Sequence, residues 1–152
     1  MWLTKKILIP TDFAESSQAA ADVGLELAKQ FKVPLVLVHT YLVPAAIYYG
    51  VPMAPTQDYG LLYEKVARES LEKERVRLAK DGTEVIAVLR PGVAWEEILS
   101  AAQEMDIGLI VMGTHGRRGL PRAILGSVTE KVVRLSPIPV LTVHGKPASQ
   151  KS

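Results

Sequence analysis

The sequence contains no cysteine at all. This absence excludes disulfide bonds, thiolate metal sites and a cysteine nucleophile, and it favours a reducing, cytoplasmic location. Long apolar runs are missing as well, because no segment approaches the roughly 20 apolar residues that a membrane-spanning helix needs. The apolar stretch near the N-terminus stops at Pro10, which is too early for a signal peptide. We therefore expect a cytoplasmic protein without a membrane partner.

An excess of charge of either sign is also lacking. The 152 residues include 18 basic and 16 acidic side chains, which gives a net charge of +2, and aromatic residues make up only 6%. Nucleic-acid binding is not favoured, since it would need a clustered basic surface. The length suits a single domain. We expect this domain to span residues 1–144, followed by a polar, disordered tail at 145–152.

What the sequence does contain is a regular alternation of two patterns. Runs rich in β-branched residues are apolar without alternation, as is typical of strands buried on both faces of a parallel sheet. These runs lie at 6–10, 35–39, 84–89, 107–112 and 139–143. Segments of helical period lie between them, at 13–31, 63–78, 94–105 and 128–135. The order predicts the α/β class, with a single open five-stranded parallel sheet that is doubly wound in the Rossmann-like manner.

In such a sheet, ligands bind beyond the carboxyl ends of the strands, where the winding direction reverses. For the strand order 3-2-1-4-5, the reversal lies between the first and fourth strands. Two segments should therefore line a site: Pro10, Thr11 and Asp12 after the first strand, and the residues from Gly113 onward after the fourth. The connection from 41 to 57 is longer than most in compact domains, so it forms either a lid over this site or a mobile excursion.

A glycine-rich segment follows the fourth strand. It contains Gly-x2-Gly-x9-Gly-Ser, with glycines at 113, 116 and 126 and the serine at 127. Gly113 and Gly116 leave backbone amides open to an approaching anion. Ser127 begins the next helix, whose first amides have no intrahelical partner and whose dipole favours negative charge. The segment is also the most basic in the chain, with arginines at 117, 118 and 122.

A second interpretation of this segment needs no ligand. Ser127 and Glu130 match a capping box, in which two side chains satisfy free amides at the helix start. Glycines after a strand are also common in simple turns. We favour phosphate binding over this interpretation, because the segment lies where the sheet places ligands and supplies many donors.

Several other protein classes fit poorly. A response-regulator receiver needs an aspartate at the end of the third strand and a lysine at the end of the fifth, and both are missing. The phosphate-loop motif of NTPases and the dinucleotide-binding glycine pattern are absent as well. Of the three histidines, His39 lies in an apolar strand and is expected to be buried and structural, whereas His115 lies in the phosphate segment. No residue is predicted to be catalytic, since no group is evident that would position an attacking water.

The spaced glycine pattern is also the signature of the ATP-binding branch of the universal stress proteins, and the sequence resembles this family at four further places. These are Lys-Lys-Ile-Leu-Ile-Pro-Thr-Asp at 5–12, Val-His at 38–39, Ile-Val-Met-Gly-Thr-His-Gly at 110–116 and Pro-Ile-Pro-Val-Leu-Thr-Val at 137–143. The match spans residues 4–144. It implies the family's five-stranded sheet, which is like that of the adenine nucleotide alpha hydrolases, with ATP in the crevice and a homodimer in many members.

The resemblance also implies particular site residues. The base and ribose would lie against Pro10, Thr11 and Asp12. The floor would be Met112 and Gly113, and the phosphate side would be His115, Gly116, Gly126, Ser127, Val128 and Thr129. The family often has an apolar side chain where this chain has Thr40, so only the Thr40 backbone is expected to face the base. No metal site built by the protein is implied, and Mg²⁺ is left open as a companion of ATP.

The function implied by the resemblance is that of a nucleotide-dependent regulatory module of the stress response. The alternative is slow ATPase activity or autophosphorylation at the same site, at a hydroxyl such as that of Ser127 or Thr129. The fifth strand should lie at the sheet edge, where only Pro137 and Pro139 would hinder its pairing with a strand of another chain. We therefore expect a homodimer through this edge.

Overall fold

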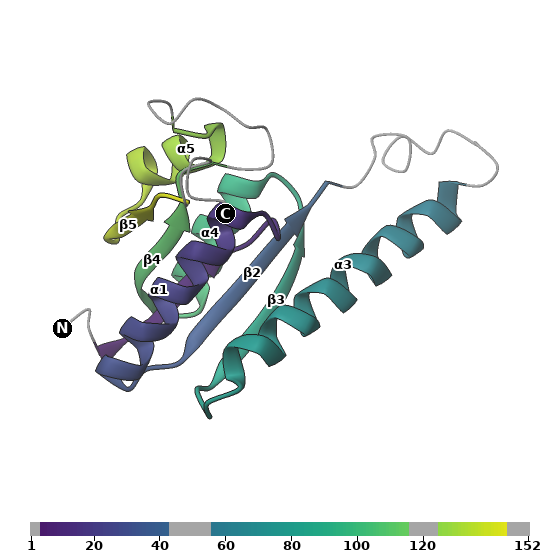
Figure 1. Cartoon of the computed structure of the whole chain (residues 1–152). Coiled ribbons are helices and arrows are strands. Elements are labelled where there is room, and N and C mark those ends of the chain that lie inside the picture. The colour runs from purple at the N-terminus through teal and green to yellow at the C-terminus, as the bar shows by residue number, and fades with distance from the viewer. Residues whose placement is uncertain (1–3, 43–55, 116–124, 146–152) are drawn as a thin grey trace, which may run out of the picture.

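The computed structural model describes residues 4–42, 56–115 and 125–145. Strands and helices alternate along them (Figure 1). The strands are β1 (Lys6–Pro10), β2 (Leu35–Tyr41), β3 (Val85–Pro91), β4 (Ile107–Gly113) and β5 (Val140–Val143). The helices are α1 (Glu15–Phe31), α3 (Thr56–Ala79), α4 (Ala94–Glu104) and α5 (Ser127–Leu135). The connection at 43–55, which carries most of the hypothetical lid, lies outside the described residues, as do residues 146–152 of the tail predicted at 145–152.

The five strands form one sheet in the order β3-β2-β1-β4-β5, and every pairing is parallel. This confirms the predicted fold class and strand order. The central strand β1 pairs with β2 on one side, where Ile7 faces Leu35, and with β4 on the other, where Leu8 faces Ile110. The winding direction therefore reverses between β1 and β4, as the sequence predicts.

Helices cover both faces of the sheet, which explains why the strands are apolar without alternation. Ile7 and Ile9 of β1 belong to a core cluster beneath α1 and α3, whereas Leu8 belongs to a second cluster on the opposite face, beneath α4 and α5. All three side chains are at most 3% exposed. Burying each of them contributes about 1.5–3 kcal/mol of hydrophobic stabilisation. The sheet is thus packed between two helical layers.

The first helix lies very close to the sheet at Gly24. A Cβ atom on this residue would come within 2.6 Å of the Ile9 Cδ1 atom. Glycine therefore allows α1 to approach β1 more closely than any other residue would. The helix ends at Lys32, whose φ of 56° and ψ of 47° place it in the left-handed conformation.

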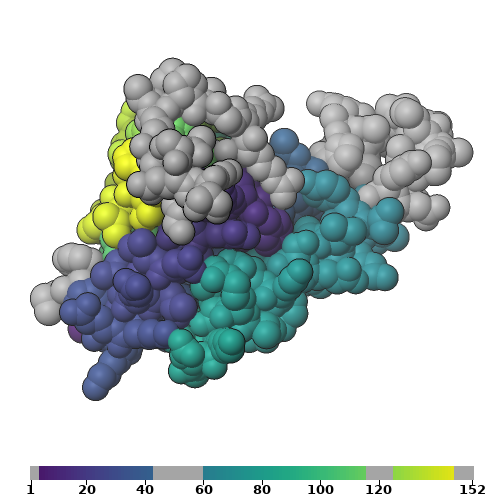
Figure 2. Space-filling model, in the orientation of Figure 1, coloured from purple at the N-terminus to yellow at the C-terminus, as the bar shows by residue number. Residues whose placement is uncertain are grey.

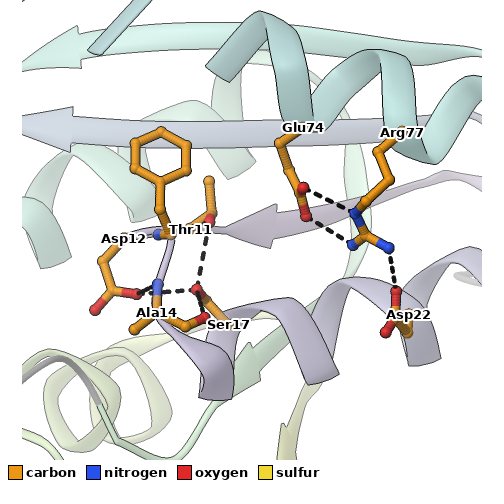
Figure 3. A network of polar contacts seen from close by, with 8 residues as sticks. Thr11, Asp12, Ala14, Ser17, Asp22, Glu74 and Arg77 are labelled. Carbon is orange, nitrogen blue, oxygen red and sulfur yellow. Dashed lines mark hydrogen bonds and ion pairs between the residues drawn. The ribbon is translucent and has the colours of Figure 1, made fainter. Parts of the chain in front are cut away.

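An ionic network joins the two helices on this face (Figure 3). The Arg77 guanidinium of α3 contacts the Glu74 carboxylate at 2.7 Å and reaches Asp22 of α1 at 2.8 Å. The hydrogen bonds that Arg77 donates to Glu74, and to a smaller extent to Asp22, raise the pKa of Arg77 despite its partial burial. The bridge links two helices that lie side by side over the sheet (Figure 2), but its Asp22 arm is exposed, so its contribution to stability is small.

No helix in the described part of the chain is both long and apolar enough to cross a bilayer.

Candidate functional site

The carboxyl ends of the parallel strands meet at one edge of the sheet, and the predicted site residues gather there. Pro10 ends β1, Met112 and Gly113 end β4, and Thr40 lies near the end of β2. Gly126 and the start of α5 adjoin the end of β4, because the Gly126 amide donates to the Thr114 carbonyl at 2.8 Å. Gly116 and the three arginines of the glycine-rich segment lie outside the described residues.

The turn after β1 is fixed by its own polar side chains (Figure 3). The Thr11 amide donates to the Val38 carbonyl of β2 at 2.8 Å, which extends the sheet by one residue. The Asp12 Oδ1 atom accepts hydrogen bonds from the Ala14 amide at 3.0 Å and the Ser17 hydroxyl at 2.9 Å. This Asx-type arrangement starts α1 without a side-chain cap at Ala14. Asp12 is thus engaged in building the turn.

The prediction that Phe13 belongs to the apolar face of the first helix is wrong. Phe13 lies in the turn before α1 with a φ of 66°, which is an uncommon conformation for a bulky residue. Its ring lies 4.5 Å from the His39 ring, measured between centroids. The His39 Nδ1 atom lies 2.7 Å from the Thr11 carbonyl oxygen. His39 is half-buried rather than buried, and its contacts support the predicted structural role.

The end of β4 touches the start of α1 at Gly113. A Cβ atom there would lie 2.3 Å from the Ser16 Oγ atom and 2.8 Å from the Ser16 carbonyl carbon and oxygen. The His115 amide also faces this serine, with its nitrogen 3.4 Å from Ser16 Oγ. Glycine is therefore required here by a close contact between two elements, in addition to any ligand. The sequence contains no local pattern that identifies Ser16, since the contact joins residues far apart in the chain.

The capping-box interpretation of Ser127 and Glu130 is wrong. Gly126 is the N-cap of α5, with a φ of −58° and a ψ of 153°, and no side chain caps the helix. Ser127 is already helical, and the first intrahelical bond runs from the Glu130 amide to the Gly126 carbonyl at 2.9 Å. The preceding three amides, those of Ser127, Val128 and Thr129, have no intrahelical acceptor. The helix start therefore presents donors and a positive dipole end to an anion.

Two hydrogen bonds hold this helix start in place. The Thr129 hydroxyl, which is buried, donates to the Gly113 carbonyl at 2.8 Å. The second is the bond from the Gly126 amide to Thr114. The three amides are thus rigidly placed beside the end of β4. The engaged Thr129 hydroxyl is a poor phosphate acceptor, whereas Ser127 is exposed.

Thr114 connects four parts of the edge. Its amide donates to the Val143 carbonyl of β5 at 3.1 Å, and its carbonyl accepts from Gly126. Its hydroxyl oxygen lies 3.0 Å from the His115 Nδ1 atom and 3.3 Å from the His144 Nδ1 atom. The sequence-based prediction does not include Thr114 or His144 in the site. The predicted strand order places the ends of β4 and β5 side by side, but no motif marks these two residues.

The described residues contain no group of three histidine, aspartate or glutamate side chains that could hold a metal ion. Asp12 is the acidic side chain at the predicted base and ribose side, and its Oδ1 atom is engaged in the turn. A magnesium ion at this edge would therefore take most of its oxygen ligands from nucleotide phosphates and water, as Mg²⁺ commonly does.

The model of the Universal stress protein family matches residues 4–144. Universal stress protein MJ0531 of Methanocaldococcus jannaschii is 34% identical over 142 residues, which cover 93% of this chain and 82% of that protein. Universal stress protein MJ0577 of the same organism is 31% identical over 160 residues, with 93% and 96% covered. The solved structure of MJ0577 has a TM-score of 0.79 at 30% identity and covers 96% of this chain and 99% of that one.

Two other solved structures contain adenine nucleotides. A universal stress protein in complex with cAMP has a TM-score of 0.67 at 24% identity, covering 93% of this chain and 98% of that one. A universal stress protein of Archaeoglobus fulgidus in complex with dAMP has a TM-score of 0.66 at 22% identity, covering 91% and 96%. Both share the fold described above. With the family model matched over nearly its whole length, this chain belongs to the universal stress protein family.

Proposed function

We propose that this protein binds ATP at the carboxyl edge of its sheet and acts in the cytoplasm as a nucleotide-dependent regulatory module. The observation that carries the proposal is the start of α5, where three consecutive amides lack intrahelical acceptors and no side chain caps them. Their placement beside the end of β4 supports a role in phosphate binding, because an anion there satisfies these donors and meets the positive end of the helix dipole.

The other half of the edge suits a nucleoside. Pro10, Thr11 and Asp12 form a rigid turn beside β4, and the Thr40 backbone lies on the neighbouring strand β2. A flat base can lie against such a preformed surface with little loss of chain entropy on binding. Relatives solved with cAMP and dAMP support an adenine nucleotide as the occupant.

We favour binding over turnover. Hydrolysis of ATP needs a metal ligand and a residue that positions water. In the described part of the chain, Asp12 and Thr129 are engaged in hydrogen bonds that build the site. Autophosphorylation would have to use another hydroxyl, such as that of the exposed Ser127. Typical enzymes turn over about 1 to 1,000 times per second. Phosphate release from the pure protein faster than about once per minute would therefore contradict the regulatory proposal.

The proposal is tested by extracting and identifying the small molecules that purify with the protein and by titrating the emptied protein with ATP. We expect an adenine nucleotide in the extract, and its loss in Gly126→Val. The backbone angles of Gly126 are open to valine, so this change places a side chain by the free amides without backbone strain. Gly82→Asn, in the turn before β3, is the control, because asparagine tolerates its φ of 86°. Absence of nucleotide from the extract together with no ATP binding would refute the proposal.

We also propose a homodimer through the edge strand β5. Among the described residues, β5 pairs only with β4, and its Leu141 side chain is 39% exposed. An unpaired edge of this kind offers backbone donors and acceptors to a second copy. Sedimentation at micromolar concentration should show a dimer, and Leu141→Glu should shift it towards monomer because two carboxylates would meet across the new pair. A wild-type monomer at that concentration would rule out this arrangement.

A further inference from the structure

The helix α3 carries two rows of residues on different sides. Members of each row are spaced alternately by four and three residues, which places the row along one side of the helix. The inner row is buried and contains Ala67, Leu71, Glu74 and Leu78. The outer row is exposed to solvent and contains Leu62, Val66, Glu69, Lys73 and Val76. Because the inner row already attaches α3 to the domain, the outer row is a second face of the same helix.

The outer row combines this spacing with exposed apolar side chains. Leu62, Val66 and Val76 are 56%, 53% and 54% exposed. In the described part of the chain, α1 and α4 have no large apolar side chain that is this open to solvent. Apolar side chains that gather on one exposed face are typical of an interaction surface. Their spacing suits a second helix as the partner, because the side chains of two such helices can interlock.

Two opposite charges lie at the centre of the outer row. The Glu69 side chain is 67% exposed, and its contact with Lys65 is loose, at 4.0 Å. Within the described ranges, Lys73 has no ion-pair partner. In a parallel pair of α3 helices, Glu69 would meet Glu69 and Lys73 would meet Lys73, which is unfavourable. In an antiparallel pair related by a two-fold axis, Glu69 of each copy faces Lys73 of the other.

The same antiparallel register aligns the apolar residues. A two-fold axis that brings Glu69 opposite Lys73 passes midway between them, at the level of Leu71. Val66 and Val76 lie at equal distances before and after this level. Val66 of each copy therefore faces Val76 of the other, so two apolar contacts flank two ion pairs. The outer row is thus complementary to itself in this orientation and register.

We propose that the outer row of α3 binds the outer row of a second copy of the chain, in antiparallel orientation. The helix covers β2 and β3, at the end of the sheet away from β5 (Figure 1). The contact is therefore separate from the proposed β5 dimer, and it does not depend on nucleotide. The interface is small and its ion pairs are exposed, so the association is weak. Where both contacts form, they join β5 dimers into larger assemblies.

The proposal is tested by sedimentation of Leu141→Glu at concentrations from about 20 to 500 μM. This background disfavours the β5 dimer, so failure of one contact is distinguished from failure of the other. We expect an equilibrium that moves from monomer towards dimer as the concentration rises. A protein that stays monomeric at about 500 μM overturns the proposal, whatever the nucleotide site and the β5 edge do.

Two charge reversals, each added to this background, identify the surface. Lys73→Glu makes both central contacts acidic and Glu69→Lys makes both basic, so each should weaken self-association at least about tenfold. An equimolar mixture of the two variants restores both ion pairs and should dimerise about as well as the protein without reversals. Glu26→Lys, at an exposed position on α1, is the control for net charge and should leave association unchanged. If the reversals do not weaken association, if the mixture does not recover it, or if Glu26→Lys weakens it equally, the proposal is wrong.

The register is tested by disulfide formation, since the chain has no cysteine of its own. Val66→Cys and Val76→Cys, mixed in the same background, should cross-link with each other on mild oxidation. Val66→Cys alone should not, because the two copies of residue 66 lie roughly 15 Å apart along the paired helices. Cross-linking of Val66→Cys alone as fast as in the mixture overturns the antiparallel register. The substituted side chains are exposed, so the variants are expected to fold, which circular dichroism checks.

Discussion

Replacing Gly113 by alanine is expected to lower the free energy of unfolding by about 3 kcal/mol, near the upper end of what overpacking usually costs. The new methyl group would lie 2.3 Å from Ser16 Oγ and 2.8 Å from two backbone atoms of Ser16. The hydroxyl can rotate away, but the backbone cannot, so the start of α1 must move from the end of β4. For a chain of this size, the melting temperature should fall by roughly 10 °C. ATP binding should be lost as well, because the movement separates the two halves of the site.

Gly145→Ala is the matched control, since Gly145 lies against the same serine. Its added Cβ atom would be 3.5 Å from the nearest Ser16 atom, which is an ordinary van der Waals contact. We expect a melting temperature within about 2 °C of the wild type, as for a substitution that makes no clash. Thermal unfolding followed by circular dichroism measures both variants. Equal stability of Gly113→Ala and the wild type would show that Ser16 of α1 is not in close contact with Gly113 of β4.

Replacing Ser127 by aspartate is expected to change binding and stability in opposite directions. A carboxylate in the first turn of α5 interacts favourably with the helix dipole and should stabilise the fold by about 0.3–1 kcal/mol. The same charge repels a phosphate bound at the helix start. Two like charges about 4 Å apart repel by roughly 4 kcal/mol at the effective dielectric constant of a protein surface. Because Ser127 is exposed and salt screens the charge, we expect a loss of affinity of at least about tenfold.

Ser127→Asn is the control for size, since asparagine has the shape of aspartate without its charge. It should bind ATP within about threefold of the wild type, a difference of less than 1 kcal/mol. Isothermal titration calorimetry at two salt concentrations measures the affinities, and the penalty of the aspartate should shrink at higher salt. If the aspartate variant binds ATP as tightly as the asparagine variant, the phosphates do not lie at the start of α5.

The strands could be predicted because their physical cause is local. Each is a short apolar run covered on both faces, and the first agrees residue for residue with β1 (Lys6–Pro10). The ends of the strands were predicted less accurately. For example, β2 continues to Tyr41, two residues beyond the apolar run. Phe13 was misplaced because apolar spacing alone does not show a turn. The Asp12 carboxylate delays the helix start until Glu15 by binding the amide of Ala14.

The site was only partly predictable. The glycine spacing and the strand order indicate where an anion would bind, and the structure places Gly113 and Gly126 together at that edge through their contacts with Thr129 and Thr114. The capping-box interpretation failed because the sequence Ser-x-x-Glu does not show whether the serine is the N-cap or the first helical residue. In the structure Gly126 is the N-cap, and Ser127 is the first residue of α5. Ser16 contacts Gly113, and His144 contacts Thr114, although the partners lie far apart in the sequence. Sequence motifs relate residues over short separations, so they did not identify these two contacts.

The pairing of β1 with β4 also has a consequence for the order in which the protein folds. Leu8 and Ile110 are neighbours in the sheet but come from opposite ends of the domain, so a long loop must close before they meet. Such closure costs entropy and makes non-local pairing slow. In a chain still emerging from the ribosome, the amides that would donate hydrogen bonds to phosphate are not in place until α5 has been synthesised and β4 has inserted beside β1. Nucleotide would therefore bind only to chains in which β4 and α5 are in place. Binding would shift the folding equilibrium towards this folded state.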